Sequence, residues 1–304
     1  MRRSLGLILA ACATAGLACA QFGGRVGDTV LYMFSTKGAG DISVVPSNTT
    51  NAAGTALQIR DPFQQIAEPF GPDFPGESRR LLHTEANDNF MMIVQREGIE
   101  SEHQQFQEHT RALIIQGILR LLPPGRPPID APAGFYSTFP KGVDFGPNVP
   151  LLQELSFLWT PFPNFPVILR APAGLVGPGV PAGQIGIDYV VDLGKFVALI
   201  PWVGLRTTYP NVGWPDGVDA KLVEKDNSLG ITVREVRIRG GRQTPTFRVN
   251  ANTHLAVLQG SVQIAPAGGQ PTTLTQFQYA FVPNNFAITL ANPKKLNVVS
   301  TAGQ

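Results

Sequence analysis

The sequence predicts an all-β fold that contains two copies of one antiparallel unit. The 304 residues include 32 Gly and 27 Pro, and the apolar runs between them are only five to eight residues long. This pattern is typical of short antiparallel strands rather than long helices. The chain also repeats itself once, at an offset of 143 residues. A strand-rich unit present in two copies predicts two domains of the same kind in one chain.

The repeat rests on ten identities between residues 96–145 and their counterparts 143 positions later. Composition alone would give about three or four. Gln116-Gly117 recurs as Gln259-Gly260, and Tyr136 recurs as Tyr279. The other identities are Arg96/Arg239, Gly98/Gly241, Thr110/Thr253, Pro123/Pro266, Gly125/Gly268, Pro128/Pro271 and Pro140/Pro283.

Short apolar or alternating runs bounded by Gly, Pro and Asn mark the individual strands. Two further stretches, 64–69 and 150–157, have the composition of a helical turn or two. The predicted strands cover residues 29–34, 90–95, 112–122, 187–191, 195–200, 231–238, 254–264 and 279–282.

The repeat and the distribution of Pro and Gly suggest a division of the chain. Residues 21–150 are expected to form the first barrel with its preceding peripheral strands, and residues 216–304 the second. Residues 151–215 are expected to connect them, because eleven of the 26 residues from 161 to 186 are Pro or Gly. Such a composition excludes a central strand.

The first 20 residues have the composition of an export signal. Arg2 and Arg3 give a basic start, an apolar stretch follows, and Ala18-Cys19-Ala20 ends in small residues, which predicts cleavage near Ala20/Gln21 and a secreted or extracytoplasmic protein. Leu9-Ala10-Ala11-Cys12 also resembles a lipoprotein box, but Cys12 lies very early for a lipid anchor.

Composition excludes several classes of partner and site. Both cysteines lie in the predicted signal, so the processed chain would have no disulfide or thiolate metal site. Without Arg2 and Arg3 there are 22 basic and 22 acidic residues, which argues against nucleic acid as a partner. No apolar run is long enough to span a membrane. Asn48 begins a glycosylation sequon, but the sequence does not decide whether Asn48 is glycosylated. It also leaves the oligomeric state open.

The spacing of the repeated residues resembles the cupin superfamily of jelly-roll barrels. Gly134, Pro140 and Gly142 match the turn of the second cupin motif, but Phe145 stands where that motif has its metal-binding histidine. In the other copy, Ile288 takes this position. The resemblance therefore implies an all-β bicupin, with two antiparallel jelly-roll (cupin) barrels in one chain.

In the first cupin motif, two histidines and a glutamate precede the glycine that ends the strand by 14, 12 and 7 residues. Counting back from Gly117 gives His103, Gln105 and Thr110. Counting back from Gly260 gives the non-ligands Thr246, Arg248 and Thr253. By this resemblance, one metal ligand of four remains in the first barrel and none in the second.

More narrowly, the chain is similar to secreted double-domain cupins such as quercetin 2,3-dioxygenase, in which the N-terminal barrel carries the metal. If a divalent ion (Fe, Cu, Mn, Ni or Zn) is retained, the candidate ligands are His103, Gln105, Glu108 and His109, with Asp144 as a further donor. Because Glu108 and His109 point to opposite faces of a strand, they cannot both converge without a bulge. Absence of any cofactor is the preferred interpretation.

Loss of charged ligands makes the barrel interiors more apolar. In the first barrel this suggests a pocket for an aromatic or sugar-like molecule, because ligand sites are concave and mostly apolar. The alternative is simple filling by inward side chains, which is preferred for the second barrel. The expected pocket residues are Phe106, Leu113, Ile115, Tyr136, Thr138, Asp144 and Phe145.

Three functions follow as hypotheses. The preferred one is an exported, metal-depleted bicupin that binds a small ligand or has a structural role and is not an enzyme. The alternative is a divergent metal-dependent oxygenase that uses the N-terminal barrel and His103. A storage or matrix protein, like the seed bicupins, would instead have both barrels filled and form an oligomer.

Overall fold

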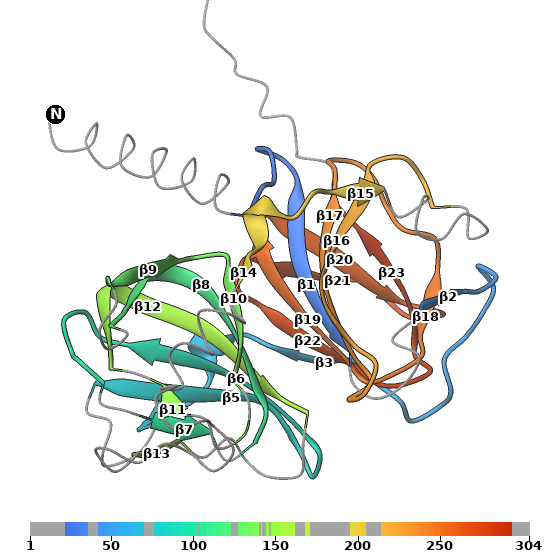
Figure 1. The fold of residues 1–304 in the computed structure, drawn as a ribbon. Coiled ribbons are helices and arrows are strands. Elements are labelled where there is room, and N and C mark those ends of the chain that lie inside the picture. Colours follow the sequence, from blue (N-terminus) through green and yellow to red (C-terminus); the bar gives the residue numbers. More distant parts are fainter. Residues whose placement is uncertain are drawn as a thin grey trace, which may run out of the picture. The chain divides into compact units, whose positions relative to one another are not determined.

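The computed structural model describes residues 22–35, 42–69, 76–101, 104–106, 108–122, 127–139, 141, 144–145, 147–161, 168–170, 195–204 and 214–293. The chain divides into two compact units, residues 60–200 (the middle unit) and residues 1–59 with 201–304 (the terminal unit). In both units the described residues form antiparallel β-sheets (Figure 1), and the described part of the middle unit also contains two short 3₁₀ turns.

The middle unit contains two sheets. The larger has the order β14-β10-β8-β12-β6-β5-β4, with β9 pairing on β8, and the smaller has the order β11-β7-β13. The strands are β4 (Glu68–Pro69), β5 (Glu77–Glu85), β6 (Asp88–Gln95), β7 (Gln104–Phe106), β8 (Thr110–Leu121), β9 (Ile129–Pro132), β10 (Phe135–Phe139), β11 (Asp144–Phe145), β12 (Asn148–Thr160), β13 (Ile168–Arg170) and β14 (Lys195–Phe196).

The terminal unit also contains two sheets, ordered β15-β16-β17-β1-β19-β22-β3 and β2-β18-β23-β20-β21. The strands are β1 (Thr29–Ser35), β2 (Ile42–Val44), β3 (Gln58–Arg60), β15 (Val203–Gly204), β16 (Val218–Asp226), β17 (Ile231–Ile238), β18 (Phe247–Val249), β19 (Thr253–Gln259), β20 (Ser261–Pro266), β21 (Thr272–Thr275), β22 (Tyr279–Val282) and β23 (Ala287–Ala291).

Strand pairing in the two units follows the repeat found in the sequence. β8 aligns with β19 and β20, and β10 with β22, at the offset of 143 residues. The hydrogen bonds of the paired threonines correspond as well. Thr110 Oγ1 donates to Glu108 O and lies 3.1 Å from Thr160 Oγ1, whereas Thr253 Oγ1 donates to Ala251 O and lies 3.1 Å from Ser35 Oγ.

Each barrel contains one strand from outside the repeated segments, and this strand follows the repeated segment in one barrel and precedes it in the other. β12, which follows the repeated segment, pairs with β6 and β8. The equivalent place in the terminal unit is taken by β1, which precedes both copies and pairs with β17 and β19. The structure thus differs from the expected division, because residues 29–35 belong with the second copy and residues 151–160 form a central strand of the first.

The expected helical turns are also revised. Residues 150–157 lie in β12, where pairing on both sides keeps the chain extended. The other turn lies slightly earlier than expected, as the 3₁₀ helix η1 (Pro62–Gln64), in which Phe63 N–H donates to the side chain of the N-cap residue Asp61. A second 3₁₀ turn, η2, covers Val197–Leu199.

Gly117 and Gly260, which the repeat pairs, have the same structural role. Their φ angles are +87° and +75°. A Cβ atom would come within 2.3 Å of Gln153 O at Gly117 and within 2.7 Å of Asp28 O at Gly260. Gly117 lets β8 approach the backbone of β12, and Gly260 lets the chain between β19 and β20 approach the segment leading into β1; only glycine fits at these positions.

We therefore expect Gly117→Ala to lower the free energy of unfolding by about 1–3 kcal/mol. Gly98 is the matched control, because its φ is +74° but a Cβ there would have no neighbour within 4 Å. Urea unfolding of both variants separates strain in φ from the close backbone approach. Equal losses for G98A and G117A would contradict the role assigned to that approach.

Two predictions concern the processing of the chain, namely its export and its glycosylation. The predicted export signal, residues 1–20, lies outside the described residues. Asn48 is exposed in a turn, which is the position a glycosylation site requires. Among the described residues, no helix is long and apolar enough to cross a membrane.

Candidate functional site

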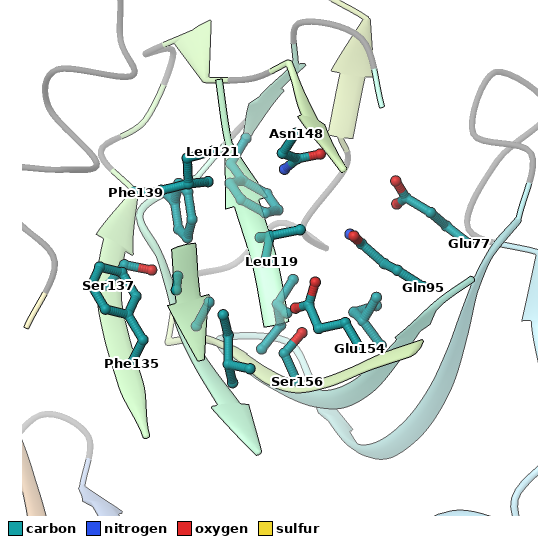
Figure 2. A pocket seen from close by; sticks show the side chains of 16 residues that line it. Glu77, Gln95, Leu119, Leu121, Phe135, Ser137, Phe139, Asn148, Glu154 and Ser156 are labelled. Atoms are coloured by element: carbon teal, nitrogen blue, oxygen red, sulfur yellow. The ribbon is translucent and has the colours of Figure 1, made fainter. Parts of the chain in front are cut away.

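The interior of the middle barrel contains a cavity (Figure 2). Its empty space is about 570 Å³, including the part open to solvent. Sixteen of the described residues, from both sheets, line it, and none of these sixteen is a cation. They are Glu77, Ile93, Gln95, Phe106, Ala112, Ile114, Leu119, Leu121, Ala131, Phe135, Ser137, Phe139, Asn148, Glu154, Ser156 and Leu158.

Small side chains account for the space in this barrel. Ala112, Ala131 and Ser156 line the cavity. By strand register, their counterparts in the terminal barrel are Leu255, Leu274 and Leu31 respectively. These three leucines are buried in the continuous core of the terminal unit. The terminal barrel is therefore filled at three positions that the middle barrel leaves open.

A row of polar side chains forms one side of the cavity. Glu77 on β5 pairs with Gln95 on β6, which pairs in turn with Glu154 on β12. Residues paired across neighbouring strands share a face of the sheet, and Figure 2 shows the three side chains next to one another. Phe135, Ser137 and Phe139 lie on the other side of the cavity.

The polar row continues toward one end of the barrel through Ser101 and Asn148. The Ser101 hydroxyl donates to Glu77 Oε1 at 2.5 Å. The backbone groups of Ser101 and Asn148 hydrogen-bond to each other, with N···O distances of 2.8 and 3.2 Å. This end of the barrel is thus held by a hydrogen-bonded network that includes a buried carboxylate.

Glu154 is the most buried of these acidic groups, with 2% of its surface exposed. Burial raises the pKa of Glu154 to about 8, a hydrogen bond with Ser156 acts in the opposite direction, and the charge of Glu77 raises it further. Glu154 is therefore mainly protonated at neutral pH, and its carboxyl group can donate a hydrogen bond as well as accept one.

Three oxygen atoms of the row have no hydrogen-bond partner among the residues the structure describes. They are Glu154 Oε2, Gln95 Oε1 and Asn148 Oδ1. Leaving a buried acceptor without a partner costs about 1–3 kcal/mol. Such atoms in a cavity indicate a place where a ligand or water can bind.

The cupin metal positions do not offer a ligand set in the described residues. The Thr110 hydroxyl already donates to Glu108 O. In the terminal barrel, Thr246 Oγ1 lies 3.0 Å from Thr289 Oγ1, and Ile288 is part of the apolar core. Within the described ranges, no group of three or more His, Cys, Asp or Glu side chains is placed to hold a metal ion. Thr110, Thr246 and Ile288 are thus engaged in contacts within the protein.

The structure places the individual candidate ligands as follows. His103 lies outside the described residues, and Gln105 is described only as backbone, paired with Asp144. Glu108 is buried and forms an ion pair with Lys141, at 3.1 Å. His109 Nδ1 accepts a hydrogen bond from Lys141 N at 3.4 Å. Glu108 and His109 therefore both contact Lys141.

Of the predicted pocket residues, Phe106 lines the cavity. Leu113, Ile115 and Tyr136 are buried, but the cavity is lined by their neighbours at alternate positions, Ala112, Ile114, Phe135 and Ser137. The prediction selected the opposite face of β8 and β10, because successive side chains of a strand alternate between faces. Thr138 is half-buried and also absent from the lining, and Asp144 and Phe145 are described only as backbone.

Sequence reasoning missed Glu77, Gln95 and Glu154, which lie on strands outside the repeated motif. A signal for Glu154 was present, since residues 154–158 alternate as Glu, Leu, Ser, Phe, Leu within a strand-like run. A carboxylate and a hydroxyl on the same face as Leu158 indicate a polar patch inside a barrel.

Comparison with known proteins identifies the fold. No protein-family model matches the chain, and no curated protein matches it. Among solved structures, vicilin from hazelnut (Corylus avellana) covers 78% of this chain and 82% of its own, at 8% identity and a TM-score of 0.53. A mutant of oxalate decarboxylase from Bacillus subtilis covers 81% and 76%, at 11% identity and a TM-score of 0.52.

A salicylate 1,2-dioxygenase variant from Pseudoaminobacter salicylatoxidans, in complex with gentisate, covers 68% of this chain and 67% of its own at 12% identity, with a TM-score of 0.48. At these identities the likeness to vicilin and to oxalate decarboxylase concerns the fold alone. Together with the two barrels described above, it shows an all-β fold of two antiparallel jelly-roll barrels in one chain, the bicupin arrangement.

Proposed function

We propose that this chain is an exported bicupin whose middle barrel binds a small, mainly apolar molecule in its cavity, without the cupin metal ion. The observation that carries the proposal is the difference between the two barrels. Ala112, Ala131 and Ser156 leave space where the terminal barrel has buried leucines. An apolar cavity of this kind is the usual form of a ligand site, and empty apolar cavities bind small aromatic molecules.

The other hypotheses have less support from the described residues. A storage role predicts two filled barrels, whereas the middle barrel contains a cavity. The oxygenase hypothesis depends on His103 and Gln105, and no observation on the described residues favours it. The threonine at the glutamate position uses its hydroxyl within the protein.

The proposal is tested by filling the cavity with the residues of the sister barrel. We expect the triple variant Ala112→Leu, Ala131→Leu, Ser156→Leu to lose at least tenfold in affinity for p-xylene, because the added side chains occupy the ligand's place. Its thermal midpoint should be equal to or above that of the wild type, since a cavity is removed.

Titration followed by protein NMR measures the affinity. Ala53→Leu is the control, because it makes the same chemical change at an exposed loop position. If the triple variant folds and still binds p-xylene as the wild type does, or if the wild type binds no aromatic probe, the cavity is not the binding site.

A further inference from the structure

The polar row gives the cavity a chemical preference that its apolar walls do not explain. The row crosses three adjacent strands, with Glu77, Gln95 and Glu154 in register. Glu154 and Asn148 are 2% and 3% exposed. Both carry an oxygen atom without a partner among the described residues, as does Gln95. These atoms lie at the cavity lining rather than at the protein surface.

The fold itself does not require this row. In the terminal barrel the positions equivalent to Glu77, Gln95 and Glu154 are Val218, Ile238 and Thr29, which are in register with one another and fully or almost fully buried. Thr29 uses its hydroxyl to donate to Ser261 O. In the terminal barrel this row is thus mainly apolar, and its one hydroxyl group is hydrogen-bonded. In the middle barrel the equivalent row is polar, and several of its oxygen atoms have no partner among the described residues.

The unmatched atoms define what a ligand must offer. Gln95 Oε1 and Asn148 Oδ1 accept hydrogen bonds, whereas a protonated Glu154 both donates and accepts. A hydroxyl group meets both requirements, because it can donate to an amide oxygen and accept from a carboxylic acid. An ammonium group only donates, so it cannot accept the hydrogen bond that a protonated Glu154 offers.

The aromatic side chains of the cavity indicate the chemical nature of the rest of the ligand. Phe106 and Phe139 both line the cavity and contact each other edge to face, with ring centroids 5.2 Å apart. Aromatic rings favour such offset or edge contacts with another ring. Leu119, Leu121 and Leu158 complete an apolar wall. A planar ring with one polar edge matches this arrangement.

We infer that the row Glu77–Gln95–Glu154, together with Asn148 and Ser156, binds the hydroxyl group of a phenol-like ligand whose ring lies among the phenylalanines of the cavity. This inference rests on the proposed function, because it names the ligand class of the same cavity. It assigns the recognition of the ligand to residues away from the cupin motif positions.

The test compares three probes of similar size, p-cresol, p-xylene and 4-methylbenzylamine, by NMR titration of the full mature chain at pH 6.5. We expect p-cresol to bind at least tenfold more tightly than p-xylene, because p-xylene leaves the buried acceptors unmatched. In the variant Glu77→Val, Gln95→Ile, Glu154→Thr, which copies the row of the terminal barrel, this ratio should fall to about one while p-xylene still binds.

Glu154→Gln is a second variant, which keeps the size and a hydrogen-bond donor at that position. It should retain most of the preference for p-cresol, so the inference does not depend on folding of the triple variant. Equal binding of p-cresol and p-xylene by the wild type would overturn hydroxyl recognition and leave the binding cavity in place. Tighter binding of the amine would overturn it in favour of a cation. Failure of all three probes would remove the proposed function itself.

Discussion

Lys221→Met is expected to lower the free energy of unfolding by about 3–5 kcal/mol, because it leaves a buried carboxylate without its cation. Lys221 on β16 and Glu235 on β17 are directly paired in the sheet, and Lys221 Nζ lies 2.8 Å from Glu235 Oε2. Both side chains are 1% exposed. Removing one member of such a pair costs more than the pair contributes, since the remaining charge cannot reach water.

The surroundings of this pair add to the expected effect. The Trp202 ring lies over Lys221 Nζ, 4.3 Å from the ring centroid, and the Arg237 guanidinium lies 4.5 Å from the same ring. Trp202 Nε1 donates to Gly23 O. A cation–π contact with a desolvated ammonium contributes about 2 kcal/mol, so Lys221→Met also weakens the packing of Trp202.

The double variant Lys221→Met, Glu235→Met is the control. It removes both charges, and we expect its urea midpoint to return close to that of the wild type, as for other buried pairs replaced by apolar residues. Burial raises the pKa of Glu235 to about 7, while Lys221 and Arg237 act in the opposite direction. The loss in the single variant should therefore be smaller at pH 5, where Glu235 can take up a proton. A single variant as stable as the wild type at pH 8 would contradict this account.

The sequence predicted the fold better than the site. The 143-residue offset and the Gly and Pro spacing identified two barrels of one kind, because turn chemistry and strand periodicity are local properties of the chain. The offset could not assign β1 and β12. Both lie outside the repeated segment. Only the strand pairing within each barrel shows that they occupy equivalent places.

The predicted pocket residues belong to the barrel that contains the cavity, and Phe106 lines it. Leu113 and Tyr136 point to the other face of their strands, next to the lining residues Ala112 and Ser137. The cavity exists because Ala112 and Ser156 are small. A cavity depends on how residues from several strands add up, so no single segment carries its signal. The 143-residue offset pairs Ala112 with Leu255, but only the strand register shows that Leu31 is the counterpart of Ser156.

Glu154 leads to the second large effect, a dependence of stability on pH. Its folded pKa of about 8 lies above the ordinary 4.5, so between these pH values the folded protein holds a proton that the unfolded chain releases. Its contribution to stability is complete below pH 4.5 and is lost as the pH rises to 8. At about 1.4 kcal/mol per pH unit, this shift corresponds to about 5 kcal/mol.

The variant Glu154→Gln cannot release this proton, and we expect its stability to exceed that of the wild type increasingly between pH 4.5 and 8. Urea unfolding of both proteins at intervals across this range measures the difference, from which the contribution of Glu235 cancels because both proteins contain it. Among the lining residues, the one other titratable group is Glu77 on β5, since β6, β8, β9 and β10 contribute neutral side chains to the described lining.

Glu77→Gln serves as the matched variant for this prediction. Since the charge of Glu77 raises the pKa of Glu154, its removal should shift the titration of Glu154 to lower pH and shrink the difference without abolishing it. Parallel stability curves for the wild type and E154Q would show that Glu154 is ionised in the folded protein. The cavity would then hold two negative charges rather than an acid and a base, and its preference would turn from hydroxyl groups to cations.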